Sequence, residues 1–131
     1  MTAVLRRLAS SALVHFLLAF LAMGGWAFYA NRKYPMPQPL VSGLVQGMLS
    51  ALLILFLKVT IDFLARRLTA AAAFWAPPLI ACLASAAILV VLHTLGGTPK
   101  IAKTIAIPLV VSTSYAMAYN YSIYRRSRAN P

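Results

Sequence analysis

Four apolar runs, bounded by basic residues or by proline and glycine, occupy nearly all of this 131-residue chain. An α-helix needs about 20 residues to cross the hydrocarbon core of a bilayer. Hydrophobic residues make up 62% of the chain and charged residues 10%, against about 45–50% and about 25% in soluble domains. Lipid is the solvent that accepts this much apolar surface. The sequence therefore predicts an all-α integral membrane protein, with residues 1–131 as one four-helix transmembrane domain.

The predicted spans are separated by short segments that cannot continue a helix. Three prolines within five residues follow the first run, Arg66 and Arg67 end the second, and two glycines with Pro99 precede the fourth. Thr98 has the residue type and position of an N-cap for the last helix. Pro77 and Pro78 suit the start of the third helix better than its interior. If that helix starts earlier, they should kink it. We expect spans at residues 8–30, 40–63, 71–95 and 101–124, followed by a frayed polar tail.

The basic residues are divided unevenly between the two sides that four spans define. Seven Lys and Arg residues lie at the two termini and in the middle loop, and four lie in the other two loops. Cytoplasmic loops carry the excess of basic residues. The count predicts two hairpins with both termini in the cytoplasm (N-in, C-in), as in a multi-pass protein of a bacterial inner membrane. The two halves are alike enough for a duplicated hairpin, although any four-span protein with basic ends has this pattern.

The net charge of +11 does not indicate nucleic-acid binding. The basic residues lie in pairs at the ends of the apolar runs, which is the usual arrangement for contact with lipid headgroups. Nucleic-acid-binding modules need a soluble basic surface that this chain lacks. The predicted partners are membrane lipids and a second copy or another membrane protein, with no nucleic acid.

The second predicted helix carries two rows of residues at a spacing of four. Small residues at this spacing allow another helix to approach closely, and the polar row beside them can form hydrogen bonds between helices. We favour a helix-packing role for both rows over a polar path through the bundle. The small row and the polar row are, respectively, Gly43, Gly47 and Ala51, and Ser42, Gln46 and Ser50.

Charged and aromatic residues near the predicted inner end form the candidate polar or lipid-headgroup site. Lys58, Asp62 and Arg66 share one helix face, and an interfacial ion pair is favoured over a coupling site. On the fourth helix, Tyr115 and Tyr119 precede a basic tail. The favoured interpretation is an aromatic cluster at the interface, and the alternative is a cleft for a lipid headgroup. The candidate residues of this helix are Tyr115, Tyr119, Arg125 and Arg126.

The residues that most enzymes depend on are scarce. Asp62 is the single acidic residue, which excludes catalysis by paired carboxylates within one chain. Cys82 is alone, and His15 and His93 are expected near opposite ends of their helices, so no metal site is predicted. We expect no catalytic residues, no metal and no cofactor, and therefore no enzyme.

Part of the last predicted helix resembles a known family. The segment from Pro99 to Lys103, together with Tyr119-Asn120-Tyr121 and Tyr124-Arg125-Arg126, resembles the last helix of GtrA-like proteins, over about a fifth of the chain. Those are four-span proteins, and the resemblance implies the handling of polyprenyl-phosphate sugars. The first helix does not share the Gly and Asn pattern of that family.

Two functions are compatible with these observations. The first is a non-catalytic assembly or accessory subunit, based on the small-residue face of the second helix. The alternative is a small transporter or flippase for anionic lipids or lipid-linked sugars. It is based on the basic excess and the tyrosine-rich inner end.

Overall fold

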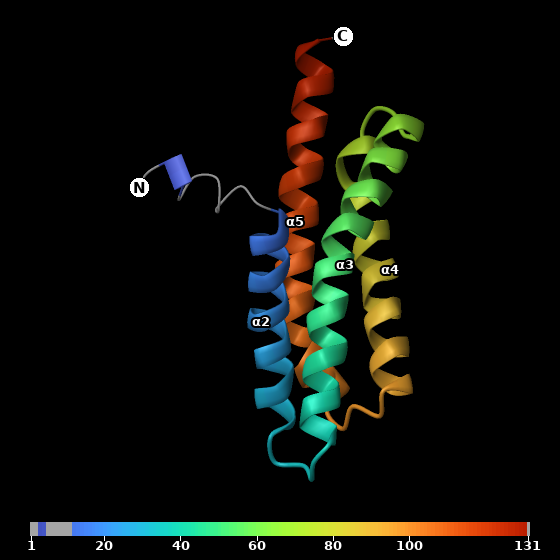
Figure 1. Ribbon diagram of the computed structural model, residues 1–131. Coiled ribbons are helices and arrows are strands. Elements are labelled where there is room, and N and C mark those ends of the chain that lie inside the picture. The colour runs from blue at the N-terminus through green and yellow to red at the C-terminus, as the bar shows by residue number, and fades with distance from the viewer. Residues whose placement is uncertain (1–2, 5–11, 131) are drawn as a thin grey trace.

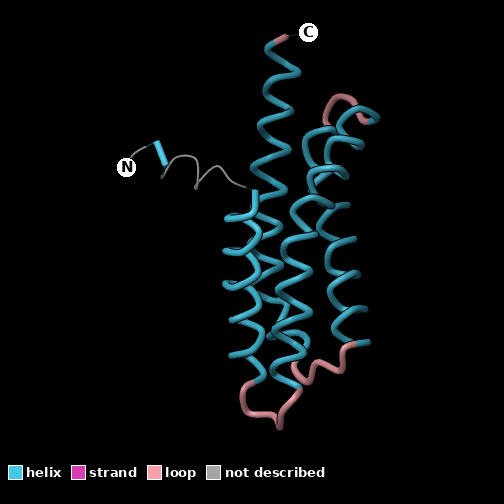
Figure 2. Tube along the Cα trace, viewed as in Figure 1, coloured by secondary structure: helices cyan, strands magenta, loops and turns pink. Residues whose placement is uncertain are grey.

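All regular structure in the described part of the chain is helical. The computed structural model describes residues 3–4 and 12–130, and the side chains of residues 12, 13 and 15 lie outside the description. Four helices run side by side as a bundle (Figure 1), and the connections between them are short (Figure 2). They are α2 (Ala12–Asn31), α3 (Gln38–Arg67), α4 (Ala72–Leu95) and α5 (Ile101–Ala129).

The helices have the length and composition of a membrane protein. Helices α3, α4 and α5 are long and apolar enough to cross a membrane, whereas the assessed part of α2, Phe16–Asn31, is a shorter apolar helix. Residues 8–11 of the first predicted span lie outside the described residues. Over its described residues the protein is thus all-helical, with three candidate membrane spans and a shorter fourth helix.

Two helices are longer than their predicted spans. Helix α3 includes Gln38 at its start and continues to Arg67. Helix α5 continues to Ala129, so the prediction of a frayed tail after Tyr124 was wrong. This segment contains no proline or glycine, and the Arg128 guanidinium donates to the Tyr124 hydroxyl at 3.0 Å, one turn away. With 29 residues, α5 is about 44 Å long, and its last turns project beyond the other helices (Figure 1).

Pro77 and Pro78 lie inside α4 and do not start it, so that prediction was also wrong. Proline has no N–H for the carbonyl four residues earlier, which here frees the carbonyls of Ala73 and Phe74. The Asn120 side chain on α5 donates through Nδ2 to both, at 3.2 and 2.8 Å. A neighbouring helix therefore supplies the hydrogen bonds that α4 loses, as membrane bundles require.

The turn after α4 fixes the position of Thr98. Gly97 has a φ of +68°, a conformation that favours glycine. The N–H of Gly97 donates to the Thr94 carbonyl at 3.1 Å, and the N–H of Thr98 donates to the His93 carbonyl at 2.9 Å. These two bonds form a Schellman motif, which closes α4. The prediction that Thr98 caps α5 was wrong, because Lys100 is the N-cap residue and Thr98 is folded back over His93.

The bundle has two ends, which we name by their residues. The proline-loop end holds the α2–α3 loop (residues 32–37) and the α4–α5 loop (residues 96–100), and the arginine end holds the α3–α4 loop (residues 68–71) and the end of α5 (Figure 1). Helix α3 contributes to both apolar core clusters. They consist of Leu49, Leu53, Leu89 and Ile105, and of Leu57, Ile61, Ala81 and Ala116.

Candidate functional site

Five buried polar side chains form one hydrogen-bonded row near the proline-loop end. The two ring nitrogens of His93 are 2.8 Å from Gln46 Oε1 and 2.7 Å from Thr98 Oγ1. Ser42 Oγ lies 3.2 Å from Thr98 Oγ1, and Gln46 Nε2 donates to Ser50 Oγ at 2.9 Å. Ser42, Gln46 and His93 are fully buried, and Thr98 and Ser50 nearly so. The polar row of α3 therefore faces α4 and the turn after it, inside the bundle.

A second buried polar contact joins α2 to the start of α5. Asn31 Nδ2 donates to Thr104 Oγ1 at 2.7 Å and to the Ala27 carbonyl at 2.8 Å. Asn31 Oδ1 accepts the backbone N–H of Lys100 at 3.0 Å. Since Asn31 is fully buried, these bonds satisfy the polar groups at the end of α2. They also fix the position of the loop that carries Thr98.

The small-residue row of α3 is covered by α2. A Cβ added at Gly24 would lie 2.7 Å from the Gly43 carbonyl oxygen, and one added at Gly47 would lie 2.8 Å from the Phe20 ring. Both separations are shorter than real Cβ contacts. Because the Gly43 carbonyl is a backbone group, α2 needs glycine at position 24, whereas a Cβ at position 47 would require the Phe20 side chain to shift. Ala51 continues the row and is half-buried. Within the chain, this face packs against α2.

A charged cluster lies on α3 and α5 toward the arginine end. Lys58 Nζ is 2.8 Å from Asp62 Oδ2, and the Tyr119 hydroxyl donates to Asp62 Oδ1 at 2.7 Å. Tyr115 stacks on Tyr119 with ring centroids 5.8 Å apart. The structure thus brings together four of the residues that sequence analysis selected. Arg66, one turn beyond Asp62, is exposed.

Arg125 and Arg126 belong to a separate surface at the end of α5. Together with Ser122 and Ala129 they line a shallow hollow of about 320 Å³. Arg125 also lies over the Tyr121 ring at 6.0 Å. Both arginines are exposed, so this surface can bind anions that approach from the headgroup region.

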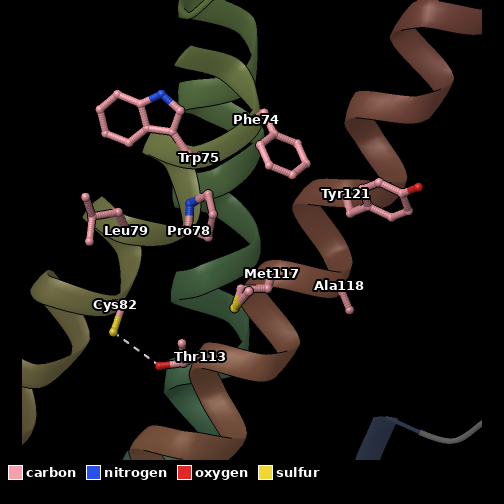
Figure 3. Close-up of a pocket in the computed structure, with 9 residues that line it drawn as sticks. All are labelled: Phe74, Trp75, Pro78, Leu79, Cys82, Thr113, Met117, Ala118 and Tyr121. Atoms are coloured by element: carbon pink, nitrogen blue, oxygen red, sulfur yellow. Dashed lines mark hydrogen bonds between the residues drawn. The ribbon is translucent and has the colours of Figure 1, made fainter. Parts of the chain in front are cut away.

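An apolar groove of about 630 Å³ runs between α4 and α5, and one of its lining residues, Tyr121, lies beneath Arg125 of the arginine surface. Figure 3 shows its lining, with Trp75 and Phe74 on one wall and Met117 and Tyr121 on the other. Deeper in the groove the Cys82 thiol lies 3.2 Å from the Thr113 hydroxyl, so these polar atoms satisfy each other. The groove offers an apolar surface of the kind that a hydrocarbon chain packs against.

A second cavity of about 320 Å³ lies between α2, α3 and α5. Its walls are mostly aliphatic, from Leu18, Met23 and Leu53 among others, but Ser50, Ser112 and Tyr115 also line it. Ser50 is the last member of the buried polar row, so that row ends at the wall of this cavity.

The described residues contain no group of three or more His, Cys, Asp or Glu side chains that could hold a metal ion. His15 is not among the side chains considered for such a group, because its side chain is not described. The expectation of no metal and no cofactor stays a prediction.

Sequence analysis missed Thr98, Asn31 and Asn120 as site or packing residues. Each is a neutral polar residue whose partners lie on another helix or in a turn, so helical spacing gave no signal for it. For Asn120 a signal existed, because two adjacent prolines in an apolar run leave carbonyls that another helix must satisfy. For Thr98, the Gly-Gly pair before it indicated a Schellman motif.

Comparison of the chain with family models, with curated proteins and with solved structures found no match. The resemblance of α5 to GtrA-like proteins therefore has no family match behind it, and the function has to be argued from the geometry.

Proposed function

We propose that the protein is a non-catalytic, four-span bacterial inner-membrane protein with both termini in the cytoplasm, which binds and moves anionic amphiphiles. These are anionic lipids or lipid-linked sugars. The observation that carries the proposal is the apolar groove between α4 and α5, one of whose lining residues, Tyr121, lies beneath the guanidinium group of Arg125.

The two parts of this surface match the two parts of an anionic amphiphile. The groove removes a hydrocarbon chain from the surrounding lipid and packs it against Trp75, Leu79 and Met117. Arg125 and Arg126 supply guanidinium groups, which bind phosphate through two parallel hydrogen bonds. Tyr121 lines the groove and also lies beneath Arg125, so it joins the apolar and basic parts.

The first experiment measures binding of dioleoyl phosphatidylglycerol to the purified protein by native mass spectrometry, with dioleoyl phosphatidylcholine as the neutral comparison. Each basic residue near an anionic lipid contributes about 1 kcal/mol. The double variant Arg125→Gln, Arg126→Gln should therefore bind phosphatidylglycerol roughly 30-fold more weakly. Arg32→Gln, which changes an exposed arginine at the proline-loop end, is the matched control and should keep wild-type binding.

A second pair of variants tests the groove itself. Ala118 is exposed and lines the groove, so Ala118→Phe should fill it and weaken lipid binding. Ala106 is exposed on the same helix outside the groove, and Ala106→Phe should leave binding unchanged. Equal binding in both variants would reject the groove as the site. Movement of the lipid is then measured in vesicles, as the rate at which fluorescent phosphatidylglycerol becomes accessible to dithionite. A rate equal to that of protein-free vesicles would reject transport.

Assembly with a second copy is the other candidate, supported by Gly25 on α2. A Cβ added at Gly25 would meet nothing within 4 Å, and this glycine lines a shallow groove between α2 and α3. A second helix can approach there at close range. The mass of the protein in nanodiscs distinguishes the candidates. If the wild type is an oligomer and the Gly25→Leu variant is a monomer, the result supports assembly. If the wild type is a monomer that binds lipid, the result supports transport.

A further inference from the structure

The hydrogen bonds around His93 have a defined direction. Gln46 Nε2 donates to Ser50, so Gln46 Oε1 is the atom that faces His93 Nε2. An amide oxygen only accepts, and His93 Nε2 must therefore carry the hydrogen. In the neutral ring Nδ1 is then an acceptor, and the Thr98 hydroxyl donates to it. Ser42 Oγ donates to Thr98 Oγ1 in turn.

Gln46 Oε1 and Thr98 Oγ1 can also accept hydrogen bonds from a protonated His93 ring. An added proton would make Nδ1 a donor, and Thr98 Oγ1 at 2.7 Å can accept from it once its own hydrogen turns away. That hydrogen can point to Ser42 Oγ at 3.2 Å, if the Ser42 hydrogen turns as well. Gln46 Oε1 keeps its role as acceptor. Both protonation states of the ring are hydrogen-bonded without any movement of the backbone or of a side-chain heavy atom.

We infer that His93 is an internal proton-binding site of the bundle, which exchanges protons with the proline-loop end through Thr98. A buried row of neutral hydrogen bonds adds little net stability, and apolar side chains of the same shape can be about as stable. Protonation gives the row a role that an apolar core could not have. A histidine is the residue whose charge changes most readily near neutral pH.

The route for the proton is short. Thr98 lies in the α4–α5 loop beside Gly97 and Pro99, which are exposed. A hydronium ion gives a proton to Thr98 Oγ1 and becomes water, while the original Thr98 O–H bond breaks and its hydrogen forms the new Nδ1–H bond. Release follows the same steps in reverse. The amide of Gln46 cannot pass a proton on without losing its own bonding, so in this arrangement the site opens to the proline-loop end only.

The charged groups near His93 are few. Helices α3 and α5 are the elements that pack against α4. On α3, Lys58 lies about 18 Å along the helix from Gln46, and Asp62 lies one turn further. Lys100 and Lys103 at the start of α5 are exposed, and their positive charge opposes a proton on His93. The remaining titratable groups of these helices lie further toward the arginine end: Arg66, Arg67, Tyr115, Tyr119, Tyr121, Tyr124, Arg125, Arg126 and Arg128.

The test is a pH titration of the full-length protein in lipid bilayers, with ¹⁵N-labelled histidine followed by solid-state NMR. A His15→Gln variant assigns the His93 signals. We expect His93 Nδ1 to change reversibly from an acceptor to an N–H as the pH is lowered, while the tryptophan fluorescence of the folded bundle is unchanged. A ring that keeps the neutral Nε2–H form until the bundle unfolds would overturn the inference.

Two matched variants test the route. Thr98→Ser keeps the hydroxyl and should titrate like the wild type, whereas Thr98→Val removes it. In Thr98→Val the titration should be lost or shifted to lower pH, because Nδ1–H would have no acceptor. A wild-type titration in Thr98→Val would reject the route through Thr98. If Thr98→Val does not fold, the wild-type titration still decides whether His93 binds a proton.

The proton site deepens the proposed transport function but can be tested apart from it. If His93 titrates and the groove binds no lipid, only the groove proposal fails. If lipid binds and moves while His93 stays neutral, only the proton site fails.

Discussion

The contact between Asn120 and the two freed carbonyls of α4 leads to a quantitative prediction. A buried acceptor left without a partner costs about 1–3 kcal/mol, and Asn120 serves two of them. Ala73 is half-buried and Phe74 is exposed, so water can reach part of this region. We therefore expect Asn120→Ala to lower the free energy of unfolding by about 2–3 kcal/mol.

The loss of unfolding free energy caused by Asn120→Ala should depend on the presence of Pro77 and Pro78. With Pro77 and Pro78 both changed to Ala, two backbone N–H groups appear, and they can donate to the carbonyls of Ala73 and Phe74 within α4. In that background Asn120→Ala should cost less than about 1 kcal/mol. The cost of Asn120→Ala should therefore differ by about 2 kcal/mol between the proteins with and without the prolines, which corresponds to roughly 30-fold in the unfolding equilibrium constant.

The four proteins of this double-mutant cycle can be compared by SDS-induced unfolding in mixed lipid–detergent micelles, followed by tryptophan fluorescence. Packing lost on shortening Asn120 is the same in both backgrounds and cancels in the difference. Equal costs of Asn120→Ala with and without the prolines would refute the reasoning. Such a result would mean that Asn120 acts through its volume and not through its two hydrogen bonds.

Two further predictions use the same unfolding assay. Gly24→Ala should destabilise the protein by about 1–3 kcal/mol relative to Gly25→Ala. The added Cβ meets the Gly43 carbonyl at 2.7 Å in the first variant and nothing within 4 Å in the second, and the gain in helix propensity is common to both. Equal stabilities would contradict the close crossing of α2 and α3. Asn31→Ala should cost about 1–3 kcal/mol, because the Lys100 N–H loses its acceptor. A loss below about 0.5 kcal/mol would show that water replaces Asn31.

The parts of the fold that sequence could predict depend on local pattern. Runs of apolar residues located three long helices that could cross a membrane, because hydropathy is a property of each segment alone. Helical spacing is also a property of one segment. It placed Ser42, Gln46 and Ser50 in one row, and it placed Lys58 and Asp62 on one face. Orientation and the arrangement in hairpins remain proposals, since they concern the membrane and not the chain by itself.

The parts that sequence reasoning missed are contacts between distant segments. His93 and Gln46 are 47 residues apart, and Asn31 and Thr104 are 73 apart. No spacing rule joins such pairs, because their meeting depends on the order of helices in the bundle. The errors at Pro77 and Thr98 have a different cause. Local preference favoured a helix start and a cap, but tertiary hydrogen bonds and the Schellman turn gave these residues other positions.

The two ends of the bundle are built from different chemistry. Near the proline-loop end the buried contacts join neutral groups, as in Asn31 with Thr104 and Gln46 with His93. Toward the arginine end, Asp62 is bound by Lys58 and by the Tyr119 hydroxyl, partly exposed to solvent. Burial of a charge requires a compensating partner, and the chain has a single carboxylate, which is already paired away from His93. A proton on His93 therefore has no fixed counter-charge among the described residues. Such a proton would be held by the hydrogen bonds of the ring to Gln46 and Thr98 alone.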